Sequence, residues 1–317
     1  MNRTELALQA MKGALRARRG LQVGSTEPMS VYDAARRLNL EVRFVDVPTL
    51  EGMYVGGPRP TILITSHRSS GRQAMTCAHE IGHHEFGHGS RIDEYLASEK
   101  VESTTAEEFL ANTFAANFLM TRGAVAQAFL ARGISATDPQ PDQVYSVANW
   151  LGVGYAALIY HVRSALRMIP RPAADRLLKV TPKEIRRQIA DRFGLPASSG
   201  GLIVVDKEWK GRPIDAQVGD VLVVPEGAQF GDSCGILRDR ALEVVSPGIG
   251  RVFQPALDWA AYVRVSRRGY TGLAEYRHLE EADDDPSLAQ LSGTADAPVD
   301  GGLIGGFDHR GRIDDDR

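Results

Sequence analysis

The residues from Thr76 to His88 read TCAHEIGHHEFGH and contain the pattern H-E-x-x-H at His79, Glu80 and His83. On a helix, positions i and i+4 lie on one face, one turn apart. The two imidazoles could therefore bind one Zn²⁺ ion. Glu80 follows His79 directly and so flanks the metal, where a carboxylate could act as the general base for a water molecule. The pattern favours a hydrolytic zinc site over a surface helix with incidental histidines.

A third metal ligand is expected from an apolar helix over residues 105–120, which read TAEEFLANTFAANFLM. Thr104 or Thr105 can cap its start. A carboxylate in so apolar a helix needs a partner, because burying an unpaired charge is costly. Binding a metal removes that cost for Glu108, and Glu107 is its only close rival.

HEIGHH, together with the motif E-x-x-A-N-x-F-A that begins at Glu108, resembles the ImmA/IrrE-type zinc metallopeptidases over roughly residues 25–168. The resemblance implies a zinc site of His79, His83 and Glu108, with Glu80 as the general base. It also implies a substrate: a helix-turn-helix repressor whose cleavage relieves repression in a stress, DNA-damage, phage or mobile-element response.

The metzincin pattern is excluded, since it needs Gly and His where this chain has Phe86 and Gly89. Hydrolysis of a peptide also needs a second donor for the oxyanion, besides the metal. The sequence does not identify this donor. Tyr54, His84 and Tyr95 are the candidates.

The other histidine and cysteine side chains favour simpler roles. His88 is expected to be structural or solvated, and Cys77 to be a small core residue. A thiolate is a good zinc ligand, so Cys234 could reach the metal and block it. Two cysteines are too few for a disulfide framework and suit a reducing cytoplasm. We expect neither a signal peptide nor a membrane span, because no apolar stretch is long enough.

Three short strand-like runs precede the H-E-x-x-H helix, at residues 41–47, 52–55 and 61–65. A small sheet followed by this helix is what a zincin needs. An extended substrate could pair with the edge strand beside the metal. We expect Thr61–Thr65, which reads TILIT, to be that edge.

The sequence as a whole predicts an α+β protein whose composition, 43 % hydrophobic and 24 % charged, is that of an ordinary soluble globular chain. Residues 1–168 are expected to form a zincin-like metallopeptidase domain with a helical, helix-turn-helix-like extension over about residues 141–168. A basic helical linker over 169–200 follows. Residues 201–278 are expected to form a small all-β domain, and 279–317 an acidic disordered tail.

The net charge of −3 hides an asymmetry, because the last 39 residues hold 11 acidic residues and 3 arginines. Residues 161–194 carry 9 Lys or Arg side chains against 3 Asp or Glu. Such a stretch is either a solvated face or a surface for nucleic acid. We predict that single-stranded DNA binds there and activates the protease, with these candidate contacts: Arg163, Arg167, Lys183, Arg186 and Arg187.

Two other functions stay open at this point. In the first, the zinc is structural and the chain is a non-catalytic DNA- or protein-binding regulator. In the second, the chain is a toxin-like hydrolase with a non-peptide substrate, because H-E-x-x-H specifies hydrolysis better than it specifies peptides. A structural zinc site usually has four protein ligands, and the sequence offers only three strong ones. That shortage favours the enzyme.

Overall fold

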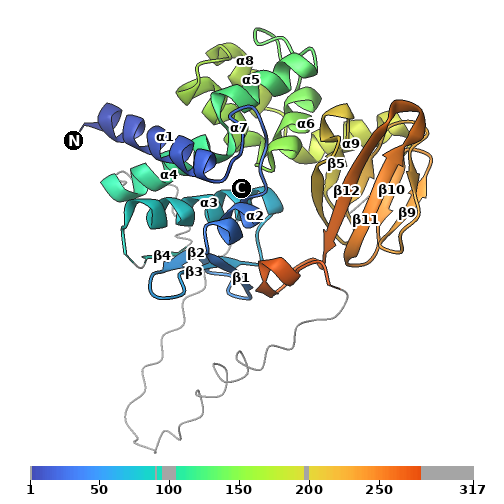
Figure 1. Ribbon diagram of the computed structural model, residues 1–317. Coiled ribbons are helices and arrows are strands. Elements are labelled where there is room, and N and C mark those ends of the chain that lie inside the picture. The colour runs from blue at the N-terminus through green and yellow to red at the C-terminus, as the bar shows by residue number, and fades with distance from the viewer. Residues whose placement is uncertain (1, 90, 95–104, 196–199, 280–317) are drawn as a thin grey trace, which may run out of the picture. The chain divides into compact units, whose positions relative to one another are not determined.

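The computed structural model describes residues 2–89, 91–94, 105–195 and 200–279 (Figure 1). The predicted acidic tail lies outside these residues except for Leu279. The N-terminal part contains both helices and strands, as predicted for an α+β chain. The elements are α1 (Arg3–Gly20), α2 (Val31–Arg37), β1 (Glu41–Val45), β2 (Leu50–Val55), β3 (Thr61–Thr65), α3 (Ser70–Phe86), β4 (Arg91–Glu94) and α4 (Ala106–Leu119).

The first sheet has the strand order β13-β1-β3-β2-β4. β3 pairs in parallel with β1 and antiparallel with β2. The prediction that Thr61–Thr65 forms the sheet edge is therefore wrong. Ile62 and Ile64 are fully buried, and so apolar a run is typical of an interior strand. Among the described residues, β4 is the outer strand beside β2.

Helices follow α4: α5 (Arg122–Ala131), α6 (Pro141–Leu151), α7 (Tyr155–Tyr160) with a π-helical turn over His161–Ala165, α8 (Arg171–Leu178) and α9 (Pro182–Phe193). Gly152 ends α6 in the left-handed conformation, and Thr181 and Glu184 form a capping box at the start of α9. The helices expected over 141–168 are present. Their apolar side chains, such as Val144 and Leu158, are fully buried, and a role as a DNA-reading unit is not confirmed.

Residues 202–266 fold into two four-stranded sheets, with orders β5-β7-β10-β9 and β6-β12-β11-β8. The strands are β5 (Leu202–Val204), β6 (Pro213–Gln217), β7 (Val221–Val223), β8 (Gln229–Phe230), β9 (Gly235–Arg238), β10 (Ala241–Val244), β11 (Gly248–Gln254) and β12 (Trp259–Ser266). After β12 the chain returns to the first sheet, where β13 (Gly272–Leu273) pairs antiparallel with β1. The predicted domain boundaries stay predictions.

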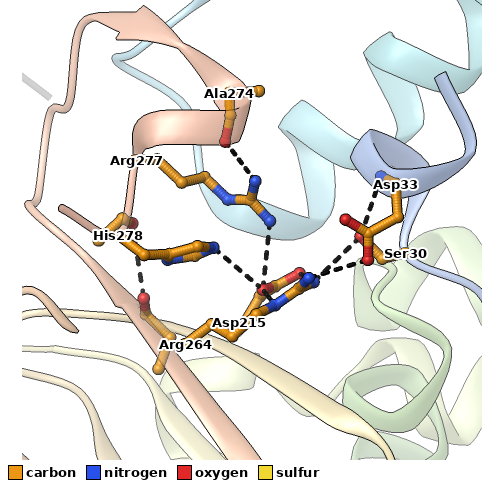
Figure 2. A network of polar contacts seen from close by, with 9 residues as sticks. Ser30, Asp33, Asp215, Arg264, Ala274, Arg277 and His278 are labelled. Carbon is orange, nitrogen blue, oxygen red and sulfur yellow. Dashed lines mark hydrogen bonds and ion pairs between the residues drawn. The ribbon is translucent and has the colours of Figure 1, made fainter. Parts of the chain in front are cut away.

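A polar network ties this β segment to α2 (Figure 2). Asp215 on β6 accepts hydrogen bonds from Arg264 at 2.7 and 2.8 Å and from Arg277 at 3.2 Å. Arg264 also donates to Asp33 on α2 at 2.9 Å. The Arg277 guanidinium lies 4.8 Å from the centroid of the Tyr32 ring. One carboxylate thus holds two arginines that come from different parts of the fold.

The pKa of Asp215 reflects this arrangement. Burial alone would raise it, but the positive charges of Arg277 and Arg264 outweigh burial and hold the pKa at about 2, below the ordinary 3.8. A carboxyl group whose pKa is depressed in the folded state stabilises that state fully above its ordinary pKa. This contribution is lost as the pH falls toward the folded-state pKa.

Asp215→Asn should lower the free energy of unfolding at pH 7 by about 1–3 kcal/mol, because two guanidinium groups lose their carboxylate. The loss is less than for a fully buried pair, since the Asp215 side chain is 34 % exposed. Urea unfolding should show the difference from wild type shrinking as the pH falls from 4 toward 2. Asp258→Asn is the control. Its carboxylate pairs with Lys210 but is fully exposed, so the midpoint should not move. Equal shifts for both variants would contradict the role given to the network.

Candidate metal centre and active site

His79, His83 and Glu108 bring three ligand atoms to one point. The two Nε2 atoms of the histidines lie 2.9 Å apart. The Glu108 carboxylate oxygens lie 3.3 Å from His79 Nε2 and 3.4 Å from His83 Nε2. Among the described residues, these three form the group of ligand atoms that could hold a metal ion. Both histidines are buried, whereas Glu108 is partly exposed.

The outer ring nitrogens of the histidines are also engaged. His79 Nδ1 lies 3.1 Å from Asn112 Oδ1. An amide oxygen only accepts, so His79 carries its hydrogen on Nδ1 and its lone pair on Nε2. His83 Nδ1 lies 2.9 Å from His88 Nδ1, and a hydrogen donated from His83 gives it the same tautomer. The two Nε2 lone pairs and the Glu108 carboxylate face one another, and these electron-rich groups repel. A cation between them would remove the repulsion, so this donor set fits a divalent ion such as Zn²⁺.

The charge of Glu108 depends on the two imidazoles beside it. When their Nε2 atoms carry hydrogens instead of a cation, hydrogen bonds from His79 and then from His83 lower the pKa of the Glu108 carboxyl well below its ordinary value, and burial opposes this only in part. Thr105 caps α4 by accepting a hydrogen bond from the Glu108 backbone N–H at 3.2 Å. The carboxylate therefore sits at the start of the helix, where a negative charge is favoured.

A close contact between α3 and α4 sets the distance between the ligands. A Cβ added to Gly82 would lie 3.0 Å from Ala111 Cα, so the helices meet where neither has a large side chain. Glu108, Ala111 and Asn112 are three and four residues apart, on one face of α4. The three named positions of E-x-x-A-N thus supply a candidate metal ligand, a small residue at the helix contact and the partner of His79.

Glu80 lies on α3 between the two histidines and is fully buried. On its outer side, the β2 backbone approaches closely at Gly52. A Cβ added there would lie 2.5 Å from Glu80 Oε1 and 2.5 Å from the Thr76 methyl group. Only glycine leaves room for the carboxylate at this place. Gly52 was not predicted from the sequence, since the role of this glycine depends on the packing of β2 against α3.

Two of the three candidate oxyanion donors contact each other. The Tyr54 hydroxyl oxygen lies 2.8 Å from His84 Nδ1, and burial raises the pKa of Tyr54. Side chains two residues apart on a strand point to the same face. Tyr54 therefore lies on the face of β2 that Gly52 turns toward α3. The third candidate, Tyr95, lies outside the described residues.

The remaining residues singled out in the sequence have other surroundings. Glu107, the rival of Glu108, is not part of the ligand group. Cys77 is fully buried on α3, as expected. Cys234 is buried beside Gly248 in the β segment and is not part of the ligand group either. His88, which was expected to be structural or solvated, contacts the buried His83.

The five basic candidates for DNA contact differ in their partners. Arg163 pairs with Asp175 at 3.6 Å. Arg186 is half-buried, whereas Lys183 and Arg187 are exposed. Arg167 has a positive φ of 51° just after the π-helical turn. The structure spreads these side chains over several environments, and nucleic-acid contact stays a prediction. No helix among the described residues is both long and apolar enough to cross a membrane.

Asn112→Ala should weaken zinc binding by about 10–100-fold, because the partner that fixes the His79 tautomer is lost. Competition with a chromophoric chelator would measure the change. Asn117→Ala is the matched control on the same helix, since its amide donates to the Thr113 carbonyl of α4 itself at 2.8 Å. The Asn112 assignment fails if both variants bind zinc with the wild-type affinity.

Comparison with known proteins bears on the same residues. The family model of the IrrE N-terminal-like domain, Peptidase_M78, matches residues 35–163. A solved structure described as a Mycobacterium tuberculosis transcriptional regulator is similar at 16 % identity and a TM-score of 0.33, over 53 % of this chain and 48 % of that one. The chain thus spans about half the length of that protein. Comparison with the curated proteins finds no match. The resemblance to ImmA/IrrE-type proteins is confirmed to this extent: the segment 35–163, which carries both motifs, matches the model of the IrrE N-terminal-like domain.

Proposed function

We propose that this chain is a zinc-dependent endopeptidase that cleaves a helix-turn-helix transcriptional repressor and so relieves repression in a stress, DNA-damage, phage or mobile-element response. The observation that carries the proposal is the convergence of His79, His83 and Glu108, with the buried Glu80 carboxylate on the same helix. We also infer a reducing cytoplasm, because both cysteines are buried and neither forms a disulfide.

The chemistry divides between the metal and the chain. A zinc ion held by the two imidazoles and Glu108 would lower the pKa of water toward about 7 and polarise the scissile carbonyl. Glu80 accepts the proton of the attacking water on its carboxylate and passes it to the leaving amine. Burial keeps this carboxylate away from bulk water, and the β2 backbone at Gly52 limits its movement.

Tyr54 is our preferred second oxyanion donor. When His84 Nδ1 carries a hydrogen and donates to the Tyr54 oxygen, the phenolic hydrogen is free to point at a developing oxyanion. The raised pKa of Tyr54 keeps that hydrogen in place at neutral pH. His84 then acts through Tyr54, and the short distance between them supports this pairing.

The sheet supports an extended mode of substrate binding. β4 is the outer strand next to β2, and β2 carries Gly52 and Tyr54. A peptide in extended conformation could pair with the backbone of β4 by β-augmentation. This replaces the edge first expected at Thr61–Thr65. The choice of a helix-turn-helix repressor as substrate rests on the family resemblance alone.

A regulator with a structural zinc is the main competing function. Structural zinc sites are usually closed by four protein ligands. Among the described residues the group has three, which supports an open position for a reacting water. A toxin-like hydrolase with a non-peptide substrate differs from the proposed endopeptidase only in what it cleaves. A cleavage assay with a helix-turn-helix repressor distinguishes the two.

Glu80→Gln should lower cleavage of a helix-turn-helix repressor by about 10²–10⁴-fold, because the general base is lost. Zinc content, measured by elemental analysis, should stay at one per chain, as in wild type. Wild-type cleavage rates in this variant would refute the role of Glu80. No cleavage by wild type, with zinc present, would favour the regulator or the toxin-like hydrolase. Adding single-stranded DNA over a range of salt concentrations tests activation, which should weaken as salt rises.

Gly52→Ala should lower the cleavage rate by about 10²-fold, because the new methyl group displaces Glu80 from its productive position. Zinc should remain bound, since Gly52 touches no ligand in the described contacts. Gly20→Ala at the end of α1 is the control, because a Cβ there meets nothing within 4 Å. Equal rates for the two variants would argue against this backbone contact.

A further inference from the structure

A second cavity lies apart from the metal centre. It has a volume of about 470 Å³ and is lined by parts of α2, α3, α6, α9, β5 and β6, elements that Figure 1 shows around the junction of the peptidase segment with the β segment. His79, Glu80, His83 and Glu108 do not line it. It meets α3 at the first turn, around Gly71, and the helix rises about 14 Å from there to the metal ligands. The volume suits a small organic ligand.

Not every charged residue that lines this cavity has a partner of opposite charge. Asp220 pairs with Arg268 at 3.0 Å, and Asp215 is held by the network described above. Arg186 and Arg212 also line the cavity and are half-buried. Neither forms an ion pair with the part of the chain that the structure describes. The Arg212 guanidinium instead lies 5.7 Å from the centroid of the Trp150 ring.

This imbalance points to an anionic ligand. A guanidinium group that is partly withdrawn from water without a counter-charge loses hydration free energy. A phosphate restores it through paired hydrogen bonds, because the planar guanidinium matches the phosphate oxygens. Arg186 and Arg212 come from α9 and from the segment before β6, so a bound anion would bring two distant parts of the chain together.

Aromatic side chains supply the rest of the lining. Four of them have their polar atom bonded to a backbone carbonyl and so offer the cavity mainly apolar ring surface. The bonds run from Tyr145 to Leu202 at 2.7 Å, from Tyr155 to Leu177 at 3.0 Å, from Trp150 to Glu208 at 3.0 Å and from Trp209 to Val204 at 3.2 Å. Tyr32 is a fifth aromatic residue of the lining. Such surfaces favour a flat ring.

We propose that this cavity binds a ligand of the nucleotide class, with the phosphates at Arg186 and Arg212 and the base among the aromatic rings. A free phosphate would leave the aromatic lining unused, and an uncharged ring would leave both arginines without a counter-charge. The nucleotide combines both features within one small molecule. The proposal concerns binding and does not depend on the chain being a peptidase.

The test is isothermal titration calorimetry of the full chain with ADP, GDP and UDP, and with adenosine and inorganic pyrophosphate as the two halves of the ligand. At least one nucleotide should bind with a Kd below about 100 μM, and each half at least about tenfold more weakly. Quenching of tryptophan fluorescence should accompany binding, since Trp150 and Trp209 are two of the three tryptophans. The Glu80→Gln chain should bind as wild type does, whatever the outcome of the cleavage assay.

Substitutions of single arginines test whether the nucleotide binds in this cavity. Arg186→Gln and Arg212→Gln should each weaken nucleotide binding by about tenfold and leave adenosine binding unchanged. Arg187→Gln is the matched control on α9, because Arg187 is exposed and does not line the cavity. The proposal is overturned if no nucleotide binds below 1 mM, if pyrophosphate binds as tightly as the nucleotides, or if Arg187→Gln weakens binding as much as Arg186→Gln.

Discussion

Backbone contact on two sides of α3 is the constraint on which the site depends. On one side the β2 backbone reaches Glu80 at Gly52, and on the other α4 reaches Gly82 at Ala111. Neither place has room for a Cβ on the glycine, so both approaches depend on the absence of a side chain there. The convergence of the two imidazoles with Glu108 follows from this spacing, because a wider gap between α3 and α4 would separate the carboxylate from both rings.

The same helix relates the metal centre to the rest of the chain. Its first turn lines the cavity that also holds Arg186 and Arg212, and its later turns carry the two histidines of the candidate metal centre. Asp215, the centre of the network in Figure 2, is one of the residues that line the same cavity. Arg277 of that network lies against Tyr32, which follows the start of α2.

The parts of the site that local spacing determines could be predicted from the sequence. H-E-x-x-H and E-x-x-A-N place their side chains by helical periodicity, and the structure brings them together. The role of Asn112 was not visible, since it depends on which face α4 turns to α3. The prediction that Thr61–Thr65 forms the sheet edge was wrong, because strand order depends on pairing between distant parts of the sequence. The partners of Asp215 are distant in the sequence, and no local pattern joins them.

The number of protein ligands distinguishes a structural zinc site from a catalytic one more directly than the fold does. A structural site is stabilised when a fourth protein ligand completes the coordination of the zinc, and this chain has two cysteines whose thiolates could bind zinc. The structure keeps both away from the ligand group, one in the interior of α3 and one in the β segment. Glu80 is fully buried on the same helix as the two histidines and is not part of the ligand group. A carboxylate at this position has no use in a site that needs zinc only for stability, whereas the proposed hydrolase needs a base there.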